Sequence, residues 1–222
     1  MPPVLAFLHT ARPNVDVFQR LMSELAPEVS TRHELVADVL SGAVASGRVT
    51  DEMRAGTEDA VRRLIAEGAN AVVCTCSTIG GVAEATAVTS PAWVMRIDRP
   101  MAEAAVASGR RVLVAAALPS TLGPTLALLQ QVAAAADRAI EVVEVLCDQA
   151  WSHFARGDRE AYAIEIARAV TAVAQPSDIV VLAQASMAPA AALIEARGIT
   201  VLSSPALGVR AALKLLQSTG AN

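Results

Sequence analysis

The stretch from Val72 to Gly81 combines residue types that can do acid–base chemistry. An apolar run leads through Cys74, Thr75 and Cys76 into two hydroxyl residues and a glycine pair. Such a run, bounded by turn residues, is typical of a buried strand in a parallel sheet, whose carboxyl end faces a ligand-binding crevice. Alternation along a strand places Cys74 on the same side as Cys76 but two residues deeper. We therefore predict that Cys74 is a core residue and that Cys76 is the exposed thiol.

Short polar side chains also follow other apolar runs. With those next to Cys76, the candidate binding residues are His9, Thr10, Ser77, Thr78, Ser120, Thr121, Gln184 and Ser186. Hydroxyl groups beside the backbone N–H groups of helix N-termini form a site for an anion. These motifs contain no Lys or Arg, although Arg12 is close, and the Walker Gly-Lys-Ser/Thr is absent. Neutral donors of this kind fit a carboxylate better than a triphosphate.

The position of Cys76 suggests a reaction at such a carboxylate. A thiol near a helix N-terminus is shifted toward thiolate, and the same donors can hold an enediolate as charge moves onto the carboxylate. The combination predicts proton transfer at a carbon next to a carboxylate, with Cys76 as the acid/base.

Each of these residues also has a structural interpretation. Cys76 can be a small core residue, and Thr10, Ser120 and Thr121 can cap helices or fix turns. His9 can be a buried histidine with satisfied ring nitrogens, and the glycine pair can only permit close packing. We interpret Cys147 as a packing residue. No histidine or carboxylate cluster has ligand spacing, so we predict no metal site.

Composition excludes several classes of protein. The chain has 222 residues, a formal net charge of −4 and only 3% aromatic residues, so nucleic acid is not an expected partner. Apolar stretches are interrupted before they reach the ~18 residues of a membrane span. The N-terminus, Met1-Pro2-Pro3, has no basic region, so we expect no secretory signal. Three cysteines without a CxxC motif indicate a reduced, cytoplasmic location.

Short strands alternate with longer helical segments along the whole chain, which predicts α/β architecture with parallel sheets. The segment from Asn70 to Ile79 aligns with Asp178 to Met187 at an offset of 178 − 70 = 108, and Val4 and Val112 differ by the same number. This repeat indicates two similar α/β lobes. If the lobes face each other, the candidate residues share one crevice.

Several segments of the chain resemble the aspartate/glutamate racemase superfamily, which includes hydantoin racemase, maleate isomerase and arylmalonate decarboxylase. These segments are Cys76-Ser77-Thr78, the matching strand end Gln184-Ala185-Ser186, Leu5 to Thr10, Leu118 to Thr125 and Ser203 to Pro205. The resemblance implies two pseudo-symmetric, Rossmann-like lobes, each a mostly parallel sheet flanked by helices, with the active site between them. It implies a first lobe of residues 1–98 and 206–222 and a second of residues 99–205. It also implies no cofactor, and family members often form homodimers.

One difference from the superfamily matters for chemistry. Its racemases use two cysteines, one from each lobe, whereas Gln184 occupies the second position here and cannot exchange a proton near neutral pH. One thiol suffices for decarboxylation or for addition to an activated double bond. The decarboxylase relatives also keep one cysteine, but in the second lobe.

The leading hypothesis is therefore a cofactor-independent, racemase-like isomerase acting on a small carboxylic acid, aspartate- or glutamate-like or a dicarboxylate. The alternatives are a single-cysteine decarboxylase and a two-lobed carboxylate-binding protein that has lost proton transfer. A nucleotide- or sugar-phosphate-binding protein is the weakest alternative, because GxGxxG and P-loop motifs are missing.

Overall fold

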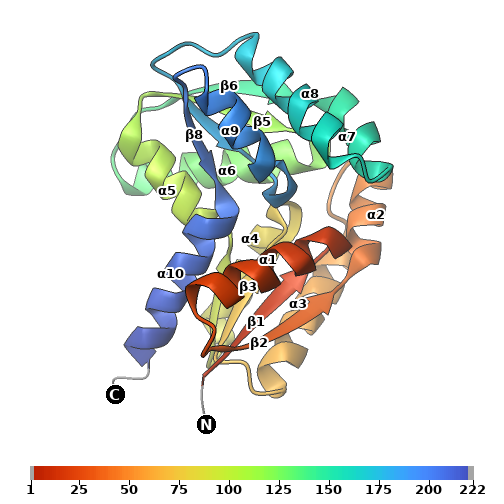
Figure 1. The fold of residues 1–222 in the computed structure, drawn as a ribbon. Helices are drawn as coiled ribbons and strands as arrows, with labels where there is room; N and C mark the ends of the chain where they lie inside the picture. Colours follow the sequence, from red (N-terminus) through yellow and green to blue (C-terminus); the bar gives the residue numbers. More distant parts are fainter. Residues whose placement is uncertain (1–2, 220–222) are drawn as a thin grey trace. The chain divides into compact units, whose positions relative to one another are not determined.

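The computed structural model describes residues 3–219 (Figure 1). Met1 and Pro2, on which the expectation of no secretory signal partly rests, lie outside the described residues. The chain divides into unit 1, residues 1–98 and 205–222, and unit 2, residues 99–204. Each unit contains a four-stranded parallel sheet with helices on its faces, which confirms the predicted fold class. In the described part of the chain, no helix is both long and apolar enough to cross a membrane.

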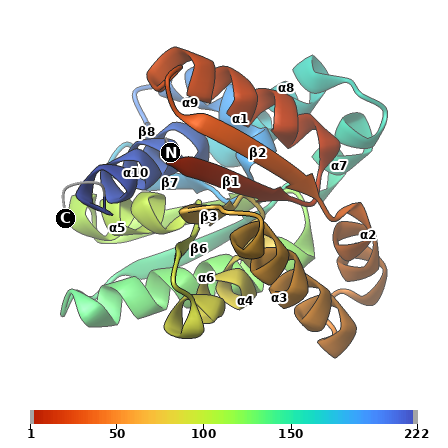
Figure 2. The same cartoon turned by 90° about the horizontal axis from the view of Figure 1, so that it is seen from below.

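The sheet of unit 1 has the strand order β2-β1-β3-β4. Its strands are β1 (Val4–His9), β2 (Ser30–Leu35), β3 (Ala71–Cys74) and β4 (Trp93–Arg96). Its helices are α1 (Arg12–Leu25), α2 (Ala37–Ser46), α3 (Asp51–Ala66), α4 (Ser77–Ala85), the 3-10 helix η1 (Thr86–Thr89) and α10 (Ser204–Thr219). Helices α1 and α10 lie on one face of this sheet, and α3 and α4 lie on the other (Figure 2).

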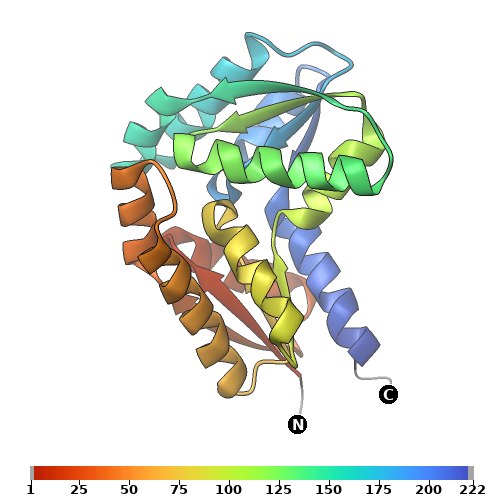
Figure 3. The ribbon, with the colours of Figure 1, turned by 180° about the vertical axis from the view of Figure 1, so that it is seen from behind.

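The sheet of unit 2 has the equivalent order β6-β5-β7-β8. Its strands are β5 (Arg111–Ala116), β6 (Glu141–Leu146), β7 (Ile179–Leu182) and β8 (Thr200–Ser203). Its helices are α5 (Arg99–Ser108), α6 (Pro119–Ala135), α7 (Asp148–Ala155), α8 (Arg159–Thr171), the 3-10 helix η2 (Ala185–Ala190) and α9 (Ala191–Glu195). Helices α5 and α6 pack together on the same side of this sheet (Figure 3), and α7, α8 and α9 supply the core of the other side.

Alternation along the central strand β1 explains how both faces of its sheet are filled. Ala6 and Leu8 pack with α3 and α4 in one apolar cluster. Phe7 lies on the opposite face, against Phe18 of α1, with ring centroids 5.4 Å apart. A strand buried on both faces reads as a continuous apolar run, as this one does.

Two helices were not predicted from the sequence. The segment containing Gly42 is helix α2, which ends at Gly47 with a left-handed φ of 68°. Helix α7, which contains Trp151, follows β6. Helix α6 starts at Pro119, and α10 starts at Ser204. Proline favours the first turn of a helix, so Pro119 and Pro205 mark these starts.

Helix α10 approaches the end of β4 closely at Gly208. A Cβ atom at this position would lie 2.3 Å from Ile97 Cδ1 and 2.4 Å from the Ile97 carbonyl oxygen. We therefore expect Gly208→Ala to destabilise unit 1 by about 1–3 kcal/mol through overpacking. Gly56→Ala in α3 is the matched control. Because a Cβ there meets nothing within 4 Å, it should stabilise the chain by up to about 1 kcal/mol. Urea unfolding of both variants tests this, and equal midpoints would contradict it.

Candidate active site

Cys76 lies in the turn between β3 and α4 and precedes the first residue of the helix. It is 9% exposed, against 0% for Cys74 and 3% for Cys147. The prediction of an exposed thiol is therefore wrong, because Cys76 packs into the same apolar cluster as Cys74 on the α3 side of the sheet. The prediction that Cys74 is a core residue is confirmed. Burial and the neighbouring Cys76 raise the pKa of the Cys74 thiol far above its usual range.

Strand pairing places Cys76 and Gln184 at equivalent positions in the two units. Leu5 pairs with Ala71 in unit 1, and Val112 pairs with Ile179 in unit 2. The offset is thus 179 − 71 = 108 for the third strand and 112 − 5 = 107 for the first, so the repeat holds to within one residue. The turns also agree, since φ and ψ are −111° and 114° at Cys76 and −118° and 138° at Gln184.

The side chain of Gln184 is oriented by the backbone of its own unit. Its Oε1 accepts a hydrogen bond of 2.6 Å from the N–H of Ala117, in the turn after β5. A backbone N–H can only donate, so the amide oxygen is fixed on this side and the NH2 group points the other way. Within the described residues the NH2 group makes no hydrogen bond. The group of Gln184 that is left for a ligand can therefore only donate hydrogen bonds.

Two buried hydroxyl groups of unit 2 have no hydrogen-bond partner among the described residues: Ser120 Oγ and Ser204 Oγ. Ser120 is 7% exposed and lies in the first turn of α6 after β5, whereas Ser204 is 0% exposed and follows β8. Strands β5, β7 and β8 are neighbours and parallel, so Ser120, Gln184 and Ser204 follow the same edge of the sheet. Buried hydroxyls are normally paired, and these two are unused donors. The sequence analysis named Ser203 to Pro205 only as part of the family resemblance and did not predict Ser204 as a binding residue, although its place after a strand gave the same signal as Ser120.

Ser186 has a partner that was not foreseen. Its Oγ lies 3.0 Å from the hydroxyl of Tyr162 in α8, and Tyr162 is 1% exposed. Burial raises the pKa of Tyr162 to about 12, so the phenol stays protonated and can donate to Ser186. Ser186 Oγ is then free to turn its own proton toward a ligand. Thr121, next to Ser120, is also buried, and its carbonyl accepts from Thr125 Oγ1 at 2.9 Å.

The candidate residues of unit 1 are all buried. Ser77 and Thr78 form the first turn of α4, and Thr10 follows β1; each is 3–5% exposed. His9 is 0% exposed, with Nδ1 2.8 Å from Thr75 Oγ1 and Nε2 2.9 Å from His33 Nδ1. Both ring nitrogens are thus occupied within unit 1, which favours the interpretation of His9 as a buried, satisfied histidine over a group that contacts substrate.

The glycine pair in α4 makes room for a buried cation. The Arg96 guanidinium contacts Asp98 through Nε–Oδ1 at 2.6 Å and Nη2–Oδ2 at 2.9 Å, and Nη2 lies 3.4 Å from the Ser77 carbonyl oxygen. A Cβ atom at Gly80 would lie 3.0 Å from Arg96 Cβ and Nε, and one at Gly81 would lie 3.6 Å from Nη1. The packing interpretation of these glycines therefore has a specific cause.

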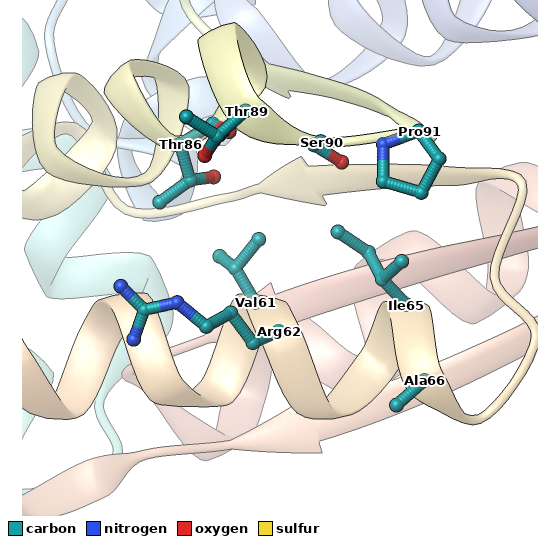
Figure 4. A pocket seen from close by; sticks show the side chains of 8 residues that line it. All are labelled: Val61, Arg62, Ile65, Ala66, Thr86, Thr89, Ser90 and Pro91. Atoms are coloured by element: carbon teal, nitrogen blue, oxygen red, sulfur yellow. Dashed lines mark hydrogen bonds between the residues drawn. The ribbon is translucent and has the colours of Figure 1, made fainter.

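A surface pocket of about 250 Å³ lies elsewhere in unit 1 (Figure 4). Val61 and Ile65 point from α3 toward the segment of Thr86 to Pro91. Its lining includes none of the candidate residues, so this pocket does not extend the site.

No family model matches the sequence, and no curated protein is significantly similar to it. Solved structures do match. Glutamate racemase from Francisella tularensis with D-glutamate is 14% identical, with a TM-score of 0.72 over 99% of this chain and 82% of that one. For aspartate racemase from Picrophilus torridus the values are 15%, 0.69, 98% and 94%. For a Gly74Cys mutant of arylmalonate decarboxylase with sulfate they are 18%, 0.61, 97% and 94%.

The chain has the racemase fold. The resemblance stated from the sequence is confirmed at this level, because aspartate and glutamate racemases and arylmalonate decarboxylase are all among the structural neighbours. In this fold, Cys76 of unit 1 and Gln184 of unit 2 follow equivalent strands. The two units therefore carry chemically different side chains, a thiol and an amide, at equivalent positions.

The buried histidines make stability depend on pH. Burial and then the charge of His33 lower the pKa of His9 to about 3, and burial lowers that of His33. Below the ordinary value of about 6.5, the unfolded chain therefore binds more protons than the folded one. We expect unit 1 to lose stability as the pH falls from about 6.5 to 4.5, by up to about 1.4 kcal/mol per pH unit from His9, and His33 contributes in the same direction.

Urea unfolding over this pH range measures the slope. In a Trp151→Phe background, the fluorescence of Trp93 reports on unit 1. His9→Asn keeps a donor toward Thr75 but does not titrate. It should therefore reduce the slope of unfolding free energy against pH by the contribution of about one bound proton, or about 1.4 kcal/mol per pH unit. An unchanged slope in His9→Asn would contradict the prediction.

Proposed function

We propose that this protein is a cofactor-independent enzyme that transfers a proton at the carbon next to a carboxylate, with Cys76 as its single acid/base. The observation that carries the proposal is the set of unused donors along one sheet edge of unit 2: the buried Ser120 Oγ and Ser204 Oγ, and the NH2 group of the half-buried Gln184. Leaving the two buried hydroxyls unpaired costs about 1–3 kcal/mol each, and a bound carboxylate would recover this cost.

The substrate class follows from the chemistry of these donors. Hydroxyl and amide groups donate to a carboxylate without adding charge, and the N-termini of α4 and α6 favour a negative group. D-glutamate bound to the Francisella racemase supports a small amino or dicarboxylic acid as the ligand class. We propose that substrate is held by Thr10, Ser77, Thr78, Ser120, Thr121, Gln184 and Ser186, with Ser204 added.

A single thiol determines what the reaction does to stereochemistry. In proton exchange, the Cys76 thiolate takes the α-proton, the electron pair moves into an enediolate, and the same thiol returns a proton to the same face. In decarboxylation, the bond to the leaving carboxylate breaks, CO2 departs, and Cys76 delivers one proton to the carbon. Gln184 cannot serve as the second acid/base. Both reactions therefore work from one face.

The presence of glutamine at position 184 also favours a second candidate, a carboxylate-binding protein without turnover. The two functions differ in whether Cys76 reacts. A carboxylate that binds, but whose α-proton does not exchange and which gives no product, would support this second candidate.

The role of Cys76 is tested by deuterium incorporation. Amino and dicarboxylic acids are incubated with the protein in D2O, and α-deuteration is followed by NMR and configuration by chiral chromatography. We expect α-deuteration with retention of configuration, lost in Cys76→Ala by at least about 100-fold. Cys147→Ala is the control and should leave the rate unchanged. Exchange that persists in Cys76→Ala would remove Cys76 from the mechanism.

The role of Gln184 is tested by Gln184→Glu, which is nearly isosteric. The carboxylate still accepts from Ala117 N–H, so the fold is kept, but it replaces the donor NH2 with a negative oxygen. We expect KM or Kd for a carboxylate substrate to rise by about 10- to 100-fold, the value of a hydrogen bond to a charged group. Gln131→Glu, which adds the same charge elsewhere in unit 2 beside Arg99, is the control. Equal affinity in wild type and Gln184→Glu would overturn this role.

A further inference from the structure

A tier of aromatic rings links the edge strand of unit 1 to the turn that carries Cys76. Phe7 and His9 lie on β1, and His33 lies beside Phe7 on β2. The rings of His9 and His33 are stacked, with centroids 5.2 Å apart and 9° between their planes. The rings of Phe7 and His33 are also 5.2 Å apart, at 14°. The charged neighbours of His33, Arg32 and Glu34, are typical of a solvated strand edge in the sequence.

Of these three residues, only His33 faces the tier. Its neighbour Arg32 forms a salt bridge with Glu67, just after α3, and its neighbour Glu34 accepts a hydrogen bond from Arg63 of α3. The face of α1 over the tier is apolar apart from Asn14, with Phe18 5.7 Å from the ring of His9. Neutral rings are therefore favoured here, in agreement with the lowered pKa values of both histidines.

A continuous chain of hydrogen bonds runs through this tier. His33 Nδ1 lies 2.9 Å from His9 Nε2, and His9 Nδ1 lies 2.8 Å from Thr75 Oγ1. Thr75 Oγ1 in turn donates to the Leu8 carbonyl oxygen at 3.2 Å. A hydroxyl has one proton, so Thr75 must accept from His9. His9 then carries its proton on Nδ1, and His33 does the same.

The free end of the chain agrees with this direction. His33 Nε2 is buried and has no hydrogen-bond partner among the described residues. In the direction derived above, this atom is an unpaired acceptor. In the opposite direction it would be an unpaired buried N–H, and such donors are rarer in folded proteins than under-satisfied acceptors.

Unit 2 has no counterpart of this chain. Registers equate His9 with Ala116, Thr75 with Ala183 and His33 with Glu144. The backbone bond is nevertheless the same in both units, from Thr75 N to Leu8 O and from Ala183 N to Ala115 O, each at 2.9 Å. The turn in unit 2 therefore forms without a histidine–threonine chain, and this chain is present only in the unit whose turn carries a thiol.

We propose that His33 is a positioning residue for Cys76, acting through His9 and Thr75. It fixes the tautomer of His9, which holds the Thr75 side chain, and Thr75 immediately precedes Cys76. The effect is to keep the Cys76 turn aligned with the N–H groups at the start of α4, where a thiolate is stabilised. This inference rests on the proposed function in assigning Cys76 a reactive role, but its tests need no substrate.

The first test reads the tautomers directly. Side-chain ¹⁵N NMR of the full chain at neutral pH distinguishes Nδ1–H from Nε2–H histidines, and the sequence has only three histidines. We expect His9 and His33 to be neutral Nδ1–H tautomers, and the third histidine, His153 of α7, lies outside the tier. An Nε2–H tautomer at His9, or a protonated His33, would overturn the proposal.

The second test measures the reactivity of Cys76. In a Cys147→Ala background, alkylation of Cys76 by iodoacetamide is followed against pH by mass spectrometry. His33→Phe keeps a ring on Phe7 and His9 but removes the donor, and we expect it to slow alkylation at neutral pH by about three- to tenfold. His33→Asn restores an N–H near Nδ1 and should return most of the rate. His153→Phe should have no effect.

The outcomes separate this inference from the proposed function. An unchanged alkylation profile in a folded His33→Phe, or equal slowing in His33→Phe and His33→Asn, would overturn the positioning role. A Cys76 whose alkylation depends on His33 while no carboxylate is turned over would support the positioning role and refute the enzyme.

Discussion

Parallel pairing between the first and third strands of each unit is the constraint on which the rest depends. In unit 1 it places Leu8 beside Cys74, and in unit 2 it places Ala115 beside Leu182. Because both strands run the same way, the turns that follow them open at one sheet edge and start helices there. Cys76 and Gln184 owe their positions to this pairing, and so do the hydroxyl groups around them.

The same scaffold is used for different tasks in the two units. Unit 1 has the thiol, with a buried network of histidines and Thr75 beneath it. Unit 2 has Ala116, Ala183 and Glu144 in place of that network and presents unused donors instead, from Ser120, Gln184 and Ser204. Pseudo-symmetry of the backbone thus coexists with different side chains at equivalent positions. Under the proposed function, unit 1 supplies the acid/base and unit 2 binds the carboxylate. This division is consistent with a reaction that needs one acid/base and a firm hold on a carboxylate.

Much of the fold could be predicted from the sequence because it depends on local pattern. Buried parallel strands are apolar runs, and a run such as Val112–Ala116 can be recognised without neighbours. The repeat between units was visible because residues 70–79 and 178–187 occupy equivalent turns. Helix α2 was missed because Gly42 lies in its interior, where local propensity is poor and tertiary packing decides.

The site was less predictable because side-chain pairing is not local. Strand registers equate Cys76 with Gln184, and the sequence repeat already implied this. The burial of Cys76 and the partnership of Ser186 with Tyr162 depend on helices far along the chain. His33 looked like part of a solvated strand edge, since Arg32 and Glu34 beside it carry charge. Only the alternation of β2 against β1 shows that it faces inward.

The packing of Gly208 against Ile97 has a consequence for biosynthesis. Helix α10 belongs to unit 1, yet it is encoded after all of unit 2. On the ribosome, residues 1–98 emerge before unit 2 but lack helix α10, which lies on one face of their sheet. Unit 2 has its complete set of elements before that helix is made, and domains generally fold as units during synthesis. The nascent chain therefore exposes an unfinished apolar surface of unit 1 until α10 has been made.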